Sequence, residues 1–258
     1  MADPTPRDTS DDRTLISVAD AGPPRRVLVT GATGYIGGRL VPRLLDAGHH
    51  VRCAVRSPRK LEARSWHDRS RLEVVRCDLT DREQTRRALD GCDAAYFLVH
   101  SMRSDRNGFS SLDREIAGIF ADECVDACIE RLIYLSSQSM YGQGEITGTD
   151  HPRVPSSYYR ISKMRGEDHV MRLMEKIPVQ LLRCANVYGY SKNLRFETLV
   201  NQFVFDAHFT RRVAVHGDPA HSMTHISLYR LVDVLAIHLQ ARHRADAAGG
   251  DVEHQHVL

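Results

Sequence analysis

The sequence has little of what marks membrane, secreted or metal-binding proteins. It contains no apolar run of 18 residues or more, so we expect no membrane-spanning helix. The first residues are rich in proline and aspartate without an apolar core, which predicts no signal peptide and a disordered arm over residues 1–24. The six cysteines include no Cys-x-x-Cys pair, so we expect reduced cysteines, no metal site and a cytoplasmic location.

A strong charge of either sign is also missing. The net charge is +2 at pH 7, which argues against nucleic acid or a membrane surface as a partner. Lysine is scarce beside arginine, so each lysine is more informative than usual. The apolar and charged shares, 42% and 26%, are ordinary for a globular protein, and 258 residues suit one α/β domain with a small C-terminal lobe. The lysines are Lys60, Lys163, Lys176 and Lys192.

The most informative segment runs from Arg26 to Gly38. A β-branched apolar run leads into a turn with glycines at every third position, and an amphipathic segment follows. This order predicts a strand, a phosphate-binding loop and a helix whose positive N-terminal end faces the phosphates. In such a loop Gly31 permits the tight turn, Gly34 allows close approach to a pyrophosphate, and Gly37 allows the helix to pack closely on the strand.

This Thr-Gly-Ala-Thr-Gly-Tyr-Ile-Gly segment resembles the extended and atypical short-chain dehydrogenases/reductases (SDRs), which include nucleotide-sugar epimerases and NmrA-like proteins. The resemblance covers roughly residues 25–240. It implies a Rossmann-type doubly wound parallel sheet that binds NAD(P) across the carboxyl ends of its strands. The cofactor-binding residues that it implies in this loop are Gly31, Thr33, Gly34, Tyr35, Ile36 and Gly37.

Strand and helix patterns alternate along the chain, which independently predicts a parallel sheet covered by helices. We expect a cofactor-binding domain over 25–189, a substrate-binding lobe over 190–244 and a flexible tail over 245–258. The strands expected after the first are 51–55, 72–77, 94–99, 132–135 and 179–182, with two short ones near 213–216 and 223–226. The helices expected after the first are 81–89, 112–129, 157–176, 194–207 and 228–243.

The end of the second strand predicts the choice of cofactor. A carboxylate there would bind the ribose 2′-hydroxyl of NAD, whereas a 2′-phosphate requires cations. Arg56 and Ser57 stand in this place, with no acid before Glu62. We therefore favour NADP(H), with NAD(H) possible; the alternative is a solvated basic loop in an arginine-rich protein.

Further site residues follow from the resemblance. Asp78 and Leu79 match the family's adenine-contacting pair, and Val99 ends the fourth strand beside the cofactor. His100 is a candidate for substrate binding, or alternatively it caps the strand end. Ser139 and Asn186 are also candidates for substrate binding, although Asn186 equally suits a structural loop.

The predicted catalytic residues are Tyr159 and Lys163, four apart on an expected helix and hence on one face. Both are also expected to contact the cofactor, and Lys163 can reach the nicotinamide ribose. A neighbouring ammonium, together with the positive charge of the oxidised nicotinamide, lowers the pKa of a phenol from its usual value near 10, which prepares it for acid–base work. Ser137, after the fifth strand, falls where the family keeps the serine that binds the substrate oxygen. A second Tyr-x-x-x-Lys pair, Tyr188 and Lys192, contains the helix-breaking Gly189, so we expect it to be uninvolved.

Three functions fit these residues. The first is an NADP(H)-dependent oxidoreductase acting on a ketone or secondary alcohol, and the second is a nucleotide-sugar epimerase with retained cofactor. The third is a non-catalytic NADP-sensing regulator, which such an intact triad disfavours. Dehydratases of nucleotide sugars carry an Asp-Glu pair where this chain has Gln138-Ser139, so water elimination lacks its usual acid and base. The helices over 112–129 and 157–176 match those that pair in many SDR dimers, which predicts a homodimer.

Overall fold

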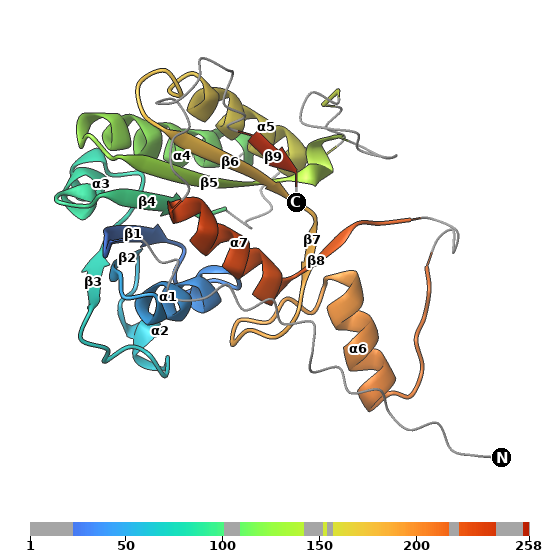
Figure 1. Ribbon diagram of the computed structural model, residues 1–258. Helices are drawn as coiled ribbons and strands as arrows, with labels where there is room; N and C mark the ends of the chain where they lie inside the picture. The colour runs from blue at the N-terminus through green and yellow to red at the C-terminus, as the bar shows by residue number, and fades with distance from the viewer. Residues whose placement is uncertain are drawn as a thin grey trace.

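The computed structural model describes residues 23–100, 109–141, 152–153, 157–216, 222–240 and 255–257. Its core is a seven-stranded sheet in the order β3-β2-β1-β4-β5-β6-β9 in which every neighbouring pair is parallel (Figure 1). The strands are β1 (Arg26–Thr30), β2 (His50–Val55), β3 (Leu72–Arg76), β4 (Ala94–Phe97), β5 (Arg131–Ser137), β6 (Val179–Cys184) and β9 (Gln255–Val257).

The order of strands reverses between β1 and β4. The chain builds outward from β1 to β3 and then returns to place β4 on the other side of β1, with Val27 opposite Ala94 and Val29 opposite Tyr96. In doubly wound folds the ligand binds in the crevice outside the carboxyl ends of the strands at such a reversal. The predicted fold class is therefore confirmed, and the topology fixes where a cofactor is to be sought.

Helices cover both faces of the sheet (Figure 1). The helices α3, α4 and α5 pack on one face, and α1, α2 and α7 pack on the other. Because both faces are covered, the central strands are mostly apolar, and all six residues of β6 are buried, with Gln180 and Arg183 among them. The helices are α1 (Gly37–Asp46), α2 (Arg59–Glu62), α3 (Arg82–Leu89), α4 (Phe109–Asp126), α5 (Tyr158–Met171) and α7 (Leu228–Gln240).

A small lobe lies beside the sheet. It consists of α6 (Leu199–Phe209) and a two-stranded parallel ribbon of β7 (Asn186–Tyr188) and β8 (His225–Ser227). Figure 1 shows α6 extending away from the sheet, beyond the end of the ribbon. No helix of the described ranges is long and apolar enough to cross a membrane.

Several expectations for the C-terminal part differ from the structure. No strand forms over 213–216, and the ribbon pairs β8 with β7, which we had not expected. The helix expected in the lobe, α7, instead packs against α1, because Leu231 and Leu235 complete the core beneath β1. In the tail, which we expected to be loose throughout, β9 pairs with β6. The rest of the tail over residues 241–254 and the expected N-terminal arm up to residue 22 lie outside the described part.

Candidate active site

The glycine loop has the backbone that its spacing predicts. Gly31 has φ +72°, a left-handed conformation that L side chains rarely adopt. A Cβ atom on Gly37 would lie 2.3 Å from the carbonyl oxygen of Gly31, so only glycine fits where α1 begins. The first turn of α1 carries no acidic residue, which leaves its positive end available to an anion.

A cavity of about 580 Å³ opens beside this loop at the carboxyl ends of the strands. Its size is typical of a small-molecule or cofactor site. Seven of the predicted cofactor residues line it, as does one predicted substrate residue. They are Gly31, Thr33, Gly34, Arg56, Asp78, Leu79 and Val99 for the cofactor, counting both loop and strand ends, and His100 for the substrate.

The remaining predicted cofactor residues are not among those that line this cavity. They are Tyr35, Ile36, Gly37, Ser57, Tyr159 and Lys163. The hydroxyl of Tyr35 donates to the carbonyl oxygen of Gly189 at 2.6 Å and accepts from Asn201 Nδ2 at 3.2 Å. Tyr35 therefore connects the glycine loop to the C-terminal lobe.

An adjoining cavity of about 650 Å³ carries a cluster of cations. Arg56 and Asp78 line both cavities, while Arg76 at the end of β3 and Arg87 on α3 line only the second. Three guanidinium groups around one cavity form an environment suited to a phosphate.

The predicted catalytic residues come together at the carboxyl edge of the sheet. Ser137 is the last residue of β5, and Tyr159 and Lys163 lie one turn apart on α5. The side chain of Ser137 hydrogen-bonds Tyr159, and the ammonium of Lys163 donates to the carbonyl oxygen of Leu135 in β5 at 3.2 Å. The two elements thus hold hydroxyl, phenol and ammonium in one place.

The electrostatics of Tyr159 differ from our expectation. Burial raises the pKa of its phenol above the usual value, while the hydrogen bond from Ser137 acts in the opposite direction. Burial also lowers the pKa of Lys163, and the thiolate form of Cys184 and the carboxylates of Asp113 and Glu167 act in the opposite direction. Without cofactor the pKa of Tyr159 is therefore raised and not lowered, because desolvation outweighs the hydrogen bond from Ser137 and the positive charge of Arg195. The part of the predicted lowering that depends on oxidised nicotinamide stays a prediction.

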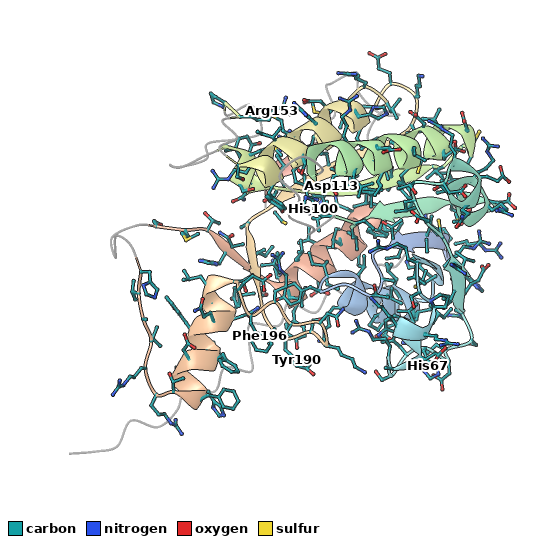
Figure 2. The ribbon with its side chains drawn as sticks, turned by 180° about the vertical axis from the view of Figure 1, so that it is seen from behind. His67, His100, Asp113, Arg153, Tyr190 and Phe196 are labelled. Atoms are coloured by element: carbon teal, nitrogen blue, oxygen red, sulfur yellow. The ribbon has the colours of Figure 1, made fainter. Side chains whose placement is uncertain are left out.

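Sequence reasoning missed Asp113, on α4. Its Oδ2 atom lies 3.0 Å from Nε2 of His100, and Figure 2 shows the two labelled residues next to each other. Burial lowers the pKa of His100 to about 3, and the positive charges of Lys163 and Arg195 lower it further. A signal was available in the sequence, because Asp113 is a charged residue at helical spacing from the buried Ala117 and Phe120.

The other substrate candidates lie in different surroundings. The backbone N–H of Ser139 donates to Oγ of Ser137 at 3.2 Å, and the two hydroxyls lie 3.0 Å apart. Asn186 is exposed in β7, where its Nδ2 donates to the carbonyl oxygen of Thr224 at 3.3 Å. Ser139 thus stays with the triad, whereas the amide of Asn186 helps to hold the ribbon.

The second Tyr-x-x-x-Lys pair does not form a helical pair. Tyr188 lies in β7, Gly189 follows with φ +122°, and Lys192 donates to the carbonyl oxygen of Ala63. Among the described residues, no group of three or more His, Cys, Asp or Glu side chains is placed to hold a metal ion.

Comparison with known sequences places this geometry in a family. Residues 27–247 match the model of the NAD dependent epimerase/dehydratase family. The chain is 30% identical over 182 residues to uronate dehydrogenase of Pseudomonas putida, covering 67% of this chain and 65% of the relative. It is 44% identical over 136 residues to 3 beta-hydroxysteroid dehydrogenase/Delta 5-->4-isomerase of Mycobacterium tuberculosis, covering 48% of this chain but 35% of the relative. The chain thus spans less than two thirds of either relative.

Solved structures show the same fold. UDP-glucuronic acid 4-epimerase of Bacillus cereus, in complex with NAD, superposes with a TM-score of 0.76 at 20% identity, covering 90% of this chain and 78% of that one. The dTDP-glucose 4,6-dehydratase DesIV of Streptomyces venezuelae gives 0.72 at 23% identity, with 84% and 72% covered. The family model spans most of the chain, and the chain has a glycine loop after the first strand of a doubly wound sheet with this strand order. The chain therefore belongs to the NAD dependent epimerase/dehydratase family, within the extended SDRs.

Proposed function

We propose that this protein is an NADP(H)-dependent oxidoreductase that transfers a hydride between nicotinamide and a ketone or secondary alcohol. The observation that carries the proposal is the meeting of Ser137, Tyr159 and Lys163 at the carboxyl edge of the sheet, where His100 lines the 580 Å³ cavity and packs against Tyr159. The glycine loop supports it, because Gly31 and Gly34 line the cavity and their lack of side chains leaves room for phosphates.

The proposed roles follow from the chemistry of each side chain. When bound, the reduced cofactor supplies the hydride. Ser137 donates a hydrogen bond to the substrate carbonyl oxygen and Tyr159 delivers its phenolic proton to that oxygen. Because burial raises the pKa of Tyr159, the phenol stays protonated at neutral pH, as an acid in carbonyl reduction must. Lys163 holds positive charge beside the phenol and can donate to the nicotinamide ribose.

The arginines support the preference for NADP(H). Arg56 is exposed and lines both cavities, and Arg76 and Arg87 add positive charge to the second. Arg56→Asp is expected to weaken NADPH binding far more than NADH binding, since it places a negative charge beside the 2′-phosphate. Arg59→Asp is the matched control, because Arg59 is an exposed arginine of the same segment that lines neither cavity. Equal loss for both cofactors in Arg56→Asp, measured by calorimetry, would contradict this role.

A nucleotide-sugar epimerase is the second candidate, and its support is the fold shared with UDP-glucuronic acid 4-epimerase. Isotope transfer separates the two functions. With 4-deuterated NADPH and a set of ketones, an oxidoreductase consumes the cofactor and yields an alcohol labelled at the carbinol carbon. An epimerase interconverts its substrates with no net consumption. The names of the relatives suggest the first compounds to test, which are uronates, 3 beta-hydroxysteroids and UDP-glucuronic acid.

A further inference from the structure

His100 lies where the end of β4, α4 and α5 meet. Its Nε2 atom is 3.0 Å from Oδ2 of Asp113 on α4 and 3.2 Å from Oγ of Ser162 on α5. Asp113 is 8% exposed and Ser162 is 1% exposed, so water competes little for these contacts. Figure 2 shows the two residues at adjacent places in the fold.

The partners of His100 determine which nitrogen carries the proton. Oγ of Ser162 donates to the carbonyl oxygen of Tyr159 at 2.9 Å, which leaves this hydroxyl as an acceptor toward His100. The ionised carboxylate of Asp113 also only accepts. The hydrogen bond with Ser162 therefore requires a proton on Nε2, which assigns this tautomer to the neutral imidazole, and the carboxylate of Asp113 is an electrostatic partner of the same N–H.

The imidazole that Asp113 holds packs against the proposed acid. The ring centroids of His100 and Tyr159 are 4.6 Å apart with an interplanar angle of 59°, a tilted arrangement that aromatic rings favour. The contact between Asp113 and His100 thus fixes one wall of the space in which the phenol lies. Ser162 links the same histidine to the backbone of Tyr159.

We propose that Asp113 and His100 form a buried positioning pair, in which the carboxylate holds the imidazole in the orientation that packs against Tyr159. This inference rests on the proposed function, because it concerns the residue that we propose to deliver the proton. It adds two positioning residues, neither of which needs to touch the reacting atoms.

The charges around Tyr159 give the pair a measurable signature. The carboxylate of Asp113 raises the pKa of Tyr159, and it raises that of Lys163 as well. Loss of this negative charge must therefore lower the pH at which Tyr159 ionises. Loss of packing alone predicts no particular direction for a change in that pH. The titratable and charged groups that act on Tyr159 or its immediate partners come from every element around it. They are His100 after β4, Asp113 on α4, Tyr134 on β5, Lys163 and Glu167 on α5, Cys184 on β6 and Arg195 in the segment after β7.

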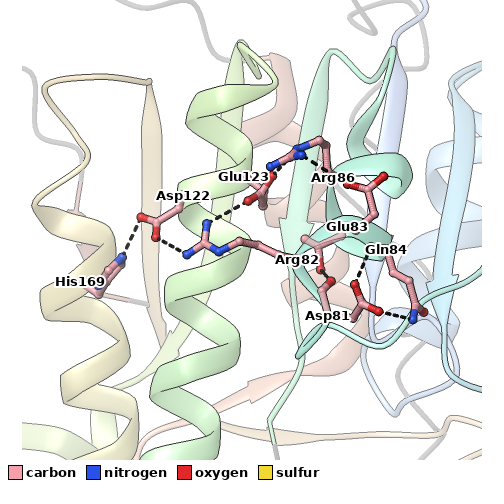
Figure 3. A network of polar contacts seen from close by, with 9 residues as sticks. Asp81, Arg82, Glu83, Gln84, Arg86, Asp122, Glu123 and His169 are labelled. Atoms are coloured by element: carbon pink, nitrogen blue, oxygen red, sulfur yellow. Dashed lines mark hydrogen bonds and ion pairs between the residues drawn. The ribbon is translucent and has the colours of Figure 1, made fainter.

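Asp113→Asn is the test variant, and α4 provides a matched control. Asp122 lies on the same helix, and its Oδ1 is 3.2 Å from Nε2 of His169 on α5, so it forms the same kind of carboxylate–histidine contact. Figure 3 shows Asp122 and His169 in a separate network with Arg82 and Glu123. Asp122→Asn removes the same charge from the same helix without affecting the surroundings of Tyr159.

The readout is the titration of Tyr159 itself. Protein labelled with ¹³Cζ-tyrosine is followed by NMR through the alkaline range, and Tyr159→Phe identifies the signal. We expect Asp113→Asn to move the ionisation of Tyr159 to lower pH and Asp122→Asn to leave it unchanged. An unchanged midpoint in Asp113→Asn, or an equal shift in both variants, would overturn the proposal. This measurement needs no substrate, so it decides the proposal even if Tyr159→Phe later shows that the proposed reaction is wrong.

The histidine gives a second test, which also decides the matter if Asp113→Asn does not fold. Glutamine at position 100 keeps an N–H near the place of Nε2, whereas alanine removes both donor and ring. With a ketone that the wild type reduces, His100→Ala is expected to lose roughly 10²-fold in turnover, the effect of a misplaced reacting group, and His100→Gln to lose at most about tenfold. Equal losses in the two variants at unchanged melting temperature would show that the contact with Asp113 does not position Tyr159.

Discussion

Arg183 and Glu167 form a buried ion pair that joins β6 to α5 one turn beyond Lys163. Nε of Arg183 is 3.0 Å from Oε1 of Glu167, and Nη2 is 2.9 Å from Oε2. Nη1 donates to the hydroxyl of Tyr141, 2.7 Å away, in the 3₁₀ turn Gln138–Tyr141 that follows Ser137. The pair thus connects the elements that carry the three proposed catalytic residues.

Arg183→Met should destabilise the protein strongly. It leaves the fully buried carboxylate of Glu167 without its main partner, and breaking such a pair costs about 3–5 kcal/mol. Arg69→Met is the control, because the contact between Arg69 and Asp46 is exposed and worth about 0–1 kcal/mol. Urea unfolding of both variants measures the difference. Similar small losses in the two would mean that the buried pair is replaceable by apolar packing.

Gly37→Ala should disrupt the glycine loop. The added Cβ would lie 2.3 Å from the carbonyl oxygen of Gly31, so the start of α1 must move, at a cost of about 1–3 kcal/mol and with loss of NADPH affinity. Gly118→Ala on α4 is the matched control, since its Cβ would make an ordinary contact of 3.5 Å with His169 and alanine favours a helix by up to about 1 kcal/mol. Calorimetry with NADPH tests both, and wild-type affinity in Gly37→Ala would contradict the role of this loop.

Much of the fold could be predicted because its signals are local. The glycine spacing determines the backbone at Gly31 and Gly37, and the tyrosine–lysine spacing places Tyr159 and Lys163 on one face of α5. The start of α3 could also be predicted from the sequence. Asp81, expected as the first residue of a helix, is the N-cap of α3, and its side chain accepts a hydrogen bond from the backbone N–H of Gln84. The prediction of a dimer through α4 and α5 stays a prediction.

The rest depends on contacts between distant segments, which no local pattern shows. The pairing of β9 with β6 and the packing of α7 on α1 each join residues far apart in the sequence. The contact between His100 and Asp113 needs the sheet to bring two elements together. The direction of the pKa shift of Tyr159 depends on the burial of its side chain. That burial cannot be predicted from the spacing of Tyr159 and Lys163.

The raised pKa of Tyr159 predicts the pH dependence of the two reaction directions. Carbonyl reduction needs the protonated phenol, so its kcat/KM should be maintained at neutral pH and fall only as the pH passes the pKa of Tyr159, above the usual value near 10. Alcohol oxidation needs the phenolate and should rise over the same range. Rates measured in both directions against pH test this. A decline of reduction between about pH 6 and 8 would assign the proton to a group other than Tyr159.

The central claim is that Tyr159 transfers the proton, and Tyr159→Phe tests it most directly. The change removes one oxygen and almost no packing volume, so folding and NADPH affinity should survive while turnover falls by roughly 10²–10⁴. Tyr188→Phe, at the uninvolved pair, should leave turnover nearly unchanged. The decisive measurement is kcat of these two variants on a ketone that the wild type reduces with NADPH. A large loss in Tyr159→Phe alone is the predicted result, and full turnover in Tyr159→Phe would contradict the account.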